Sequence, residues 1–190
     1  MRKPREVINQ LSPEDALTVL KTLADSDAQI AKRIAEVATE HLREVNWEDV
    51  NADVYDALES LEVEDVWNQA GPSRNGYREP DEVAEEMIGS ILQPYMEDLN
   101  RYQRLNMPEQ AAYVCMGILT GLYQFEHESS SEFREWAVDI PLFYAEDTLK
   151  KWYTKHVSQE TVDEMKSFIQ EHMPGWQELQ RLLKRTTVKR

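Results

Sequence analysis

The stretch Ala111–Phe125, AAYVCMGILTGLYQF, decides the fold that we expect for this chain. It is apolar on nearly every side of a helix, which is typical of a helix that its neighbours bury on all faces. At about 15 residues, it falls short of the ~20 apolar residues that a membrane-spanning helix needs. Gly117 and Gly121 lie one turn apart on one face, where the lack of side chains lets a neighbouring helix approach closely. We therefore expect this helix to be the buried centre of a soluble domain.

Capped amphipathic segments lie on both sides of this central helix. Ser12 and Pro13 open one helix and the stretch Asp25-Ser26-Asp27 caps the next, so the two should form an antiparallel hairpin. Pro80 opens a long helix that Pro94 interrupts, where we expect a kink. Residues 71–77 concentrate turn formers and form the longest irregular segment in the sequence. The pattern predicts an all-α fold, a multi-helix bundle or a short α-solenoid of about seven to nine helices.

Composition favours one domain over residues 1–190 with a single hydrophobic core. Apolar residues make up 41% of the chain and charged residues 30%, with only six glycines and eight prolines. This balance suits helices joined by short connections. The ends, at about 1–8 and 184–190, are basic, and we expect them to be flexible.

The net charge of −15 is unevenly distributed. Residues 1–5 carry three basic side chains and residues 181–190 carry five, with no acidic group in either stretch. The rest of the chain holds 13 basic and all 36 acidic side chains, a net charge near −23. Because such a surface repels phosphates, we expect no direct binding to nucleic acid.

The single cysteine, Cys115, excludes an intrachain disulfide framework. The first residues are basic but lead into a polar stretch, unlike a secretory signal. We therefore expect a cytoplasmic protein that does not insert into membranes. Cys115 lies in the middle of the apolar stripe and is best interpreted as a buried structural residue.

The sequence shows no motif for catalysis or for a cofactor. Residues 126–135 bring one imidazole, that of His127, together with four carboxylates. A helical carboxylate metal site, however, needs Glu-x-x-His pairs, and none of the four histidines has a glutamate three positions before it. We prefer a solvated loop and helix cap here, and expect no metal, cofactor or catalytic residue.

Two polar interruptions, at 71–79 and 126–131, are the candidate binding loops. Tyr77 is either part of a recognition tip or a staple that packs on the following helix. The five tryptophans fall within apolar stripes, where core positions are the usual interpretation. The candidate interaction residues are Arg74, Tyr77, Arg78, Glu126, His127, Glu128 and Glu132.

Four segments carry a resemblance to a known family: 11–15 (LSPED), 65–67 (DVW), 76–80 (GYREP) and 121–128 (GLYQFEHE). In these, the chain resembles the helical region that accompanies SWIM-type zinc fingers in prokaryotic proteins. The finger itself is absent, because one cysteine cannot supply its ligands. The resemblance implies a helical, tetratricopeptide-like accessory domain and brings no catalytic residues with it.

Three functions remain open. The first is a non-enzymatic adaptor or accessory module that binds another protein through a groove or through the two loops. The second is an acidic decoy that occupies the basic groove of a nucleic-acid-binding protein. The third is a carboxylate-rich metal-binding protein. The sequence leaves the identity of the partner and the oligomeric state open.

Overall fold

The computed structural model describes residues 4–73, 76–153 and 157–187. The chain forms two compact units, Met1–Glu44 and Val45–Arg190. Every buried apolar residue of the described chain lies between Val54 and Leu183. The one hydrophobic core that composition predicts therefore belongs to the second unit.

The first unit consists of α1 (Pro4–Ile8), α2 (Pro13–Ser26) and α3 (Ala28–Leu42). Ser12 caps α2 by accepting a hydrogen bond from the Asp15 amide, and Asp27 caps α3 through the amides of Gln29 and Ile30. Both predicted caps are confirmed. The two helices contact each other across a connection made by Asp27 alone, so they form a helical hairpin. Neither helix contains a buried residue.

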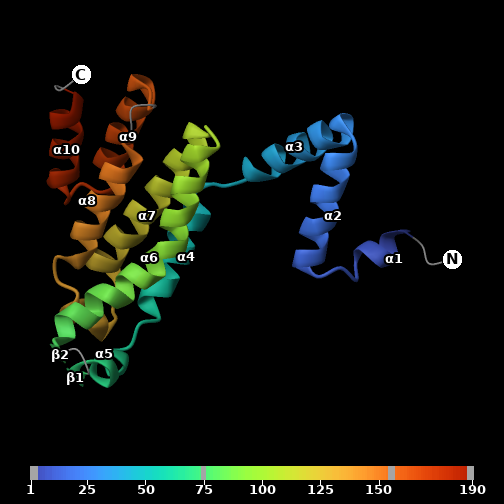
Figure 1. The fold of residues 1–190 in the computed structure, drawn as a ribbon. Coiled ribbons are helices and arrows are strands. Elements are labelled where there is room, and N and C mark those ends of the chain that lie inside the picture. Colours follow the sequence, from blue (N-terminus) through green and yellow to red (C-terminus); the bar gives the residue numbers. More distant parts are fainter. Residues whose placement is uncertain (1–3, 74–75, 154–156, 188–190) are drawn as a thin grey trace. The chain divides into compact units, whose positions relative to one another are not determined.

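The second unit is an all-α multi-helix bundle with one small β-hairpin (Figure 1). Its elements are α4 (Trp47–Glu59), α5 (Val63–Gln69), β1 (Gly71–Ser73), β2 (Gly76–Arg78), α6 (Pro80–Arg104), α7 (Pro108–Glu128), the 3-10 helix η1 (Glu132–Trp136), α8 (Ile140–Trp152), α9 (Gln159–His172) and α10 (Gln177–Thr187). The described chain thus holds ten α-helices, nine of them seven residues or longer. The predicted all-α class is confirmed.

Helix α7 lies at the centre of the bundle, as the sequence predicts. It contacts α4, α6, α8 and α9, and thirteen of its 21 residues are buried. Gly117 and Gly121 face α4: a Cβ at 117 would lie 2.5 Å from the Cβ of Val50, and one at 121 would lie 2.8 Å from the Cβ of Val54. The close approach of a neighbouring helix is therefore confirmed. None of the helices in the described ranges is both long and apolar enough to cross a membrane.

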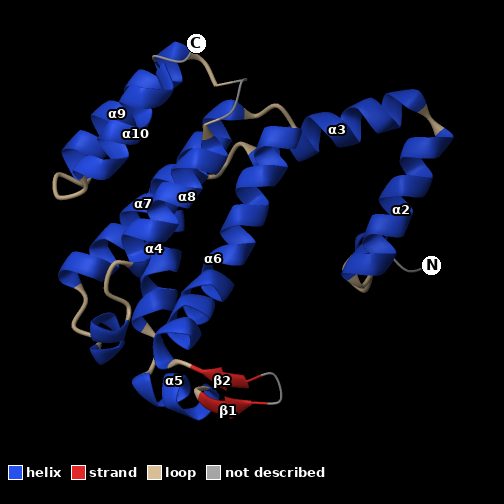
Figure 2. Cartoon of the chain, turned by 60° about the vertical axis from the view of Figure 1, so that its left-hand side comes forward, coloured by secondary structure: helices blue, strands red, loops and turns tan. Residues whose placement is uncertain are grey.

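Three local features differ from the sequence prediction. The segment expected to be irregular contains the antiparallel hairpin β1–β2, in which Pro72 pairs with Tyr77 (Figure 2). Its strands are only three residues long, too short for an alternating pattern to show in the sequence. Helix α6 continues through Pro94, which lies on its exposed side, so the proline does not end the helix; the expected kink stays a prediction. The polar break begins at Ser129 rather than at Glu126, because α7 continues to Glu128.

The basic ends are partly helical. Residues 4–8 form α1, and residues 184–187 belong to the last turn of α10. The outermost residues, 1–3 and 188–190, lie outside the described ranges. Whether these ends move in solution stays a prediction.

Candidate functional site

Two tryptophans form an exposed pair at one end of the bundle. Trp67, from α5, and Trp136, from η1, lie edge to face with ring centroids 5.1 Å apart. Their exposed fractions are 55% and 36%, respectively. Tryptophan is highly buried on average in folded proteins, and exposed tryptophans are enriched at protein–protein interfaces. The pair is therefore a candidate contact surface.

Both rings are held by buried neighbours. In the short helix α5, Val66 is fully buried, which turns the adjacent Trp67 about 100° away from the core. In η1, Phe133 is fully buried and packs near Phe125 of α7. The two elements also contact each other. The indole pair thus sits on a rigid support.

The start of η1 is fixed by a hydrogen-bonded serine. The buried Ser129 hydroxyl donates to the Glu59 carboxylate at the end of α4. Arg134 Nη1 donates to the Ser129 carbonyl at 2.8 Å, and the Ser131 hydroxyl caps η1 at the Phe133 amide. Much of the predicted polar break 126–131 therefore serves to anchor the tryptophan pair.

Further exposed apolar side chains belong to the same end of the bundle. The β1–β2 hairpin follows α5 directly (Figures 1 and 2) and carries the exposed Tyr77. Val138, in the connection from η1 to α8, and Phe143, in the first turn of α8, are also exposed. We use the term aromatic end for the set Trp67, Tyr77, Trp136, Val138 and Phe143.

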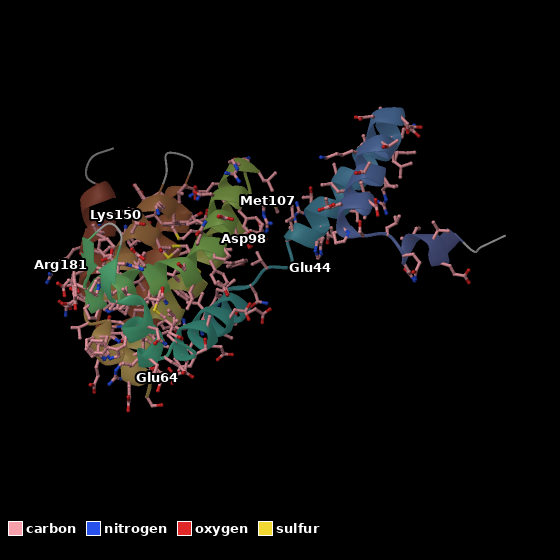
Figure 3. All side chains as sticks on the ribbon, turned by 60° about the horizontal axis from the view of Figure 1, so that its bottom comes forward. Glu44, Glu64, Asp98, Met107, Lys150 and Arg181 are labelled. Carbon is pink, nitrogen blue, oxygen red and sulfur yellow. The ribbon has the colours of Figure 1, made fainter. Side chains whose placement is uncertain are left out.

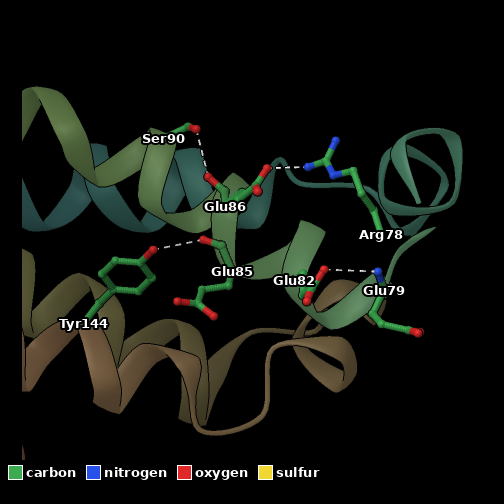
Figure 4. Close-up of polar contacts among 7 residues, drawn as sticks. All are labelled: Arg78, Glu79, Glu82, Glu85, Glu86, Ser90 and Tyr144. Carbon is green, nitrogen blue, oxygen red and sulfur yellow. Dashed lines mark hydrogen bonds and ion pairs between the residues drawn. The ribbon is translucent and has the colours of Figure 1, made fainter. Parts of the chain in front are cut away.

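Contacts between α6 and α8 place Phe143 at this end. The hydroxyl of its neighbour Tyr144 donates to the Glu85 carbonyl at 3.1 Å, in the second turn of α6 (Figure 4). Burial, together with the nearby carboxylate of Glu85, raises the pKa of Tyr144 above its ordinary value. The hydroxyl therefore stays protonated and remains a donor at neutral pH.

The aromatic end is strongly acidic. Residues 59–86 and 126–139 contain fourteen acidic and three basic side chains, a net of −11 out of the −15 of the whole chain. Glu64 marks this end in Figure 3, and Met107 marks the opposite one. Twelve of these acids are exposed: Glu62, Glu64, Asp65, Glu79, Asp81, Glu82, Glu85, Glu86, Glu128, Glu132, Glu135 and Asp139.

Four of the seven predicted interaction residues lie outside α7. Arg74 lies outside the described residues. Tyr77 is exposed on β2, which favours the recognition tip over the staple. Arg78 forms an ion pair with Glu86 of α6 (Figure 4), so its charge is already neutralised. Glu132 is exposed at the start of η1, beside the aromatic pair.

The remaining predicted residues end α7. Glu126 accepts a hydrogen bond from the Trp176 indole at 3.2 Å, and His127 stacks on Tyr123 with ring centroids 4.1 Å apart. His127 also lies edge to face with Trp176, with ring centroids 6.3 Å apart, so both residues help to join α7 to the connection before α10. Glu128 is exposed. Burial raises the pKa of Tyr55, and the negative charges of Glu59 and Glu128 add to that effect. Of these three residues, Glu128 is the most available to a partner.

Sequence reasoning assigned the tryptophans to the core, and the structure separates them. Trp152 and Trp176 are buried, whereas Trp67 and Trp136 are not. The signal for Trp67 is local. Val66 and Trp67 are adjacent in a helix that packs on the core through one face, so their two large side chains cannot both point into the core. Trp136 has no such signal, because a 3-10 helix breaks the usual periodicity.

Metal ligands and one cavity are the other features of the described chain that bear on a site. Within the described ranges, no three His, Cys, Asp or Glu side chains are grouped so as to hold a metal ion. A cavity of about 290 Å³ at the junction of α6 and α7 is lined by Gln103 and Trp152, among others. The Gln103 amide already donates to the carbonyls of Lys151 and Trp152, at 3.0 and 3.2 Å.

A comparison of the chain with protein-family models, with curated proteins and with solved structures finds no match.

Proposed function

We propose that this chain is a helical protein–protein interaction module, an adaptor or accessory domain, that binds a basic, amphipathic segment of another protein at its aromatic end. The observation that carries this proposal is the exposed Trp67–Trp136 pair among the exposed acids of that end. Tryptophan side chains provide most of the binding energy in many interfaces, where a few anchors dominate. An accessory role is also what the resemblance to the region beside SWIM-type zinc fingers implies.

The charge pattern sets the chemistry of the partner. With a net charge of −11 over residues 59–86 and 126–139, the aromatic end attracts Lys- and Arg-rich segments and repels acidic ones. The apolar rings add contacts that a purely ionic surface lacks. A cationic helix with one apolar face satisfies both features, because its leucines or aromatics cover the indoles while its basic side chains meet the carboxylates. A guanidinium group could also stack on an indole ring.

The second candidate, an acidic decoy for a nucleic-acid-binding protein, rests on the same carboxylates. A phosphate mimic, however, binds through its negative charge, and an exposed aromatic pair does not contribute to that function. The two candidates therefore differ in salt dependence. The affinity of binding by charge alone falls steeply as the salt concentration rises. Binding in which the partner buries the indole rings keeps much of its affinity at high salt.

Peptide titration tests the proposal directly. A synthetic amphipathic Lys/Leu helix and an oligolysine of equal charge are titrated into the full chain at 50 and 300 mM salt, with binding measured by calorimetry. The module should bind the amphipathic peptide at both salt concentrations and the oligolysine only at the lower one. Equal, salt-labile binding of both peptides would favour the decoy instead.

Matched variants locate the surface. Trp67→Ala and Trp136→Ala should each weaken binding of the amphipathic peptide about tenfold or more. Leu105→Ala is the apolar control, because Leu105 is 50% exposed and directly follows the last residue of α6, at the opposite end of the bundle. Glu132→Gln with Glu135→Gln should lower the association rate, whereas Glu171→Gln should not, because Glu171 ends α9 near the start of α4. Unchanged binding in both tryptophan variants would refute the proposed surface.

A further inference from the structure

A cavity lies where α6 turns into α7, at the end of the bundle that Met107 marks in Figure 3. Helix α6 ends at Arg104 and α7 begins at Pro108, so three residues connect them. Asn106 takes the left-handed conformation, with a φ of 55°, and the Met107 amide donates to the Tyr102 carbonyl at 2.9 Å. This tight turn forms one wall of the cavity, whose volume is about 290 Å³.

The end of α8 forms another wall. Trp152, the last residue of α8, lines the cavity and is 1% exposed. The Gln103 carboxamide of α6 donates to the carbonyls of Lys151 and Trp152, which fixes the end of α8 against α6. The two walls are therefore hydrogen-bonded to each other, and the cavity is part of the bundle itself.

The indole N–H of Trp152 is a buried donor without a hydrogen-bond acceptor among the described residues. The indole of Trp176, which is similarly buried, donates to Glu126 at 3.2 Å. Buried polar groups in native proteins almost always have a partner, because an unpaired one loses its bonds to water without replacement. An unpaired donor on a side chain that lines a cavity points to an acceptor from outside the described chain.

The charge in the described lining of the cavity is positive. Arg104 supplies it, the other polar lining residues are carboxamides, and none of the lining residues is acidic, although the chain has 36 acidic side chains. Arg104 forms no ion pair with a described residue, whereas Arg101 of the same helix pairs with Asp98 at 3.2 Å. A guanidinium binds a carboxylate through two parallel hydrogen bonds. The cavity therefore suits an anionic group.

The amino end of α7 adds to the positive potential. Met107 and Pro108 stand at the start of this helix and line the cavity, and no side chain caps the helix. The first amides of a helix lack acceptors within it, and the helix dipole places partial positive charge there. The adjacent acid, Glu109, does not line the cavity, and its carboxylate accepts from the Tyr113 hydroxyl at 3.0 Å.

The rest of the described lining is apolar. Met107, Pro108, Ala111 and Val157 contribute to it, together with the ring of Trp152. Apolar walls with a few convergent polar groups are the usual form of a small-molecule site. At roughly 30 Å³ for each water-sized group, the volume of about 290 Å³ holds about ten non-hydrogen atoms.

We propose that this cavity binds a small monocarboxylate with an apolar body, of about ten non-hydrogen atoms in all, such as a medium-chain fatty acid. The carboxylate pairs with Arg104 and supplies the acceptor that the Trp152 indole lacks, while the apolar body lies against Met107 and Ala111. One guanidinium balances one negative charge, which favours a carboxylate over a dianionic phosphate in a chain of net charge −15. The cavity is separate from the aromatic end, so the inference does not depend on the proposed function.

Calorimetry on the full chain tests the ligand class with octanoate, octanol and acetate. Octanoate has about ten non-hydrogen atoms and should bind with a Kd below about 1 mM, as expected for a ligand of that size. Octanol, which lacks the charge, should bind at least about tenfold more weakly, and acetate, which lacks the apolar body, should not bind detectably. Equal affinity for octanoate and octanol, or no binding of octanoate up to about 5 mM, would overturn the proposal.

Fluorine NMR of the chain labelled with fluorotryptophan locates the ligand. The Trp152 signal, identified by its loss in Trp152→Phe, should shift with octanoate and saturate at the calorimetric Kd. The signals of Trp67 and Trp136, which belong to the aromatic end, should stay in place. A shift of those two signals with an unmoved Trp152 signal would place the binding elsewhere and refute this site.

Variants of the lining test the two parts of the site. Arg104→Gln should lower the affinity for octanoate about tenfold, to that for octanol. Arg101→Gln is the matched control and should stay within about twofold, because Arg101 pairs with Asp98 and does not line the cavity. Met107→Trp fills the cavity and should abolish octanoate binding, with circular dichroism to verify the fold. Because Arg104 is exposed, its variant keeps the fold, and an unchanged octanoate affinity in Arg104→Gln would refute the carboxylate contact.

Discussion

Gly117 of α7 lies directly against Val50 of α4: a Cβ at position 117 would stand 2.5 Å from the Val50 Cβ and 2.8 Å from the Trp47 carbonyl oxygen. A Cβ atom essentially never comes this close to another heavy atom, so the backbone of α7 at Gly117 packs directly against the Val50 side chain. The absence of a side chain at 117 therefore sets the distance between the central helix and its neighbour.

The first prediction concerns this contact. In a solvent-exposed helix, Gly→Ala stabilises by up to about 1 kcal/mol, because alanine restricts the unfolded chain. Gly117→Ala should instead destabilise by about 1–3 kcal/mol, since α4 has to shift to admit the methyl group. Urea unfolding followed by circular dichroism measures the change. Ser167→Ala on the exposed side of α9 is the control and should stay within about 0.5 kcal/mol.

The second prediction separates anchoring from binding in the segment after α7. Ser129→Ala removes the buried donor to the Glu59 carboxylate, which should cost about 1–3 kcal/mol of stability. Ser130 is exposed, so Ser130→Ala should have little effect. Thermal unfolding of the two variants measures the difference. Equal melting temperatures would show that the Ser129 hydrogen bond does not stabilise the fold.

The third prediction concerns the single thiol. Cys115 is fully buried, and burial raises the pKa of its thiol far above the ordinary value. The thiolate, which is the reactive form, is therefore almost absent at neutral pH. Ellman's reagent should label the native protein only as fast as it unfolds and should label it fully in 6 M guanidinium. Immediate stoichiometric labelling of the native chain would contradict this burial.

The fourth prediction concerns pH. The hydrogen bond from Lys166 at 2.9 Å lowers the pKa of Asp163 below its ordinary value, and the Gln159 amide adds to the effect. A carboxyl group with a lowered pKa contributes stability above the pKa of the unfolded chain, and that contribution disappears as the pH falls through the folded value.

Carbon-detected NMR titration measures this pKa in the folded chain. Lys166→Gln should raise the pKa of Asp163 toward the ordinary value. Lys150→Gln is the matched control, because Lys150 pairs with Glu146 on another helix. An Asp163 pKa that is the same in all three proteins would rule out the hydrogen bond as its cause.

The helices and their caps could be predicted because their signals are local. Ser12 and Asp27 each accept a hydrogen bond from an amide two or three residues ahead, so the chemistry of a cap is contained in four residues. The burial of α7 was readable for a similar reason, since a helix that is apolar on all sides has no face for water. These features do not depend on which other helix packs where.

The candidate sites could be predicted only in part. Tyr77 and Glu132 were among the expected interaction residues and are exposed at the aromatic end, whereas Glu126 and His127 face the connection before α10. Residues one position apart on a helix point about 100° apart. Which of them meets a partner depends on the rotation of the helix within the bundle, and packing against distant residues sets that rotation.

The sequence by itself was enough to define an acidic all-α chain with its centre at 111–125. Hydrophobic periodicity, capping residues and charge counts can each be determined from short stretches of the chain. The exposure of individual side chains could not be determined in this way, because it depends on neighbours far away in the sequence. Leu20 and Leu122 look alike in their helical stripes, yet Leu122 is fully buried and Leu20 is 44% exposed. The difference arises because α7 is surrounded by α4, α6, α8 and α9, whereas the described first unit offers α2 a single long neighbour, α3.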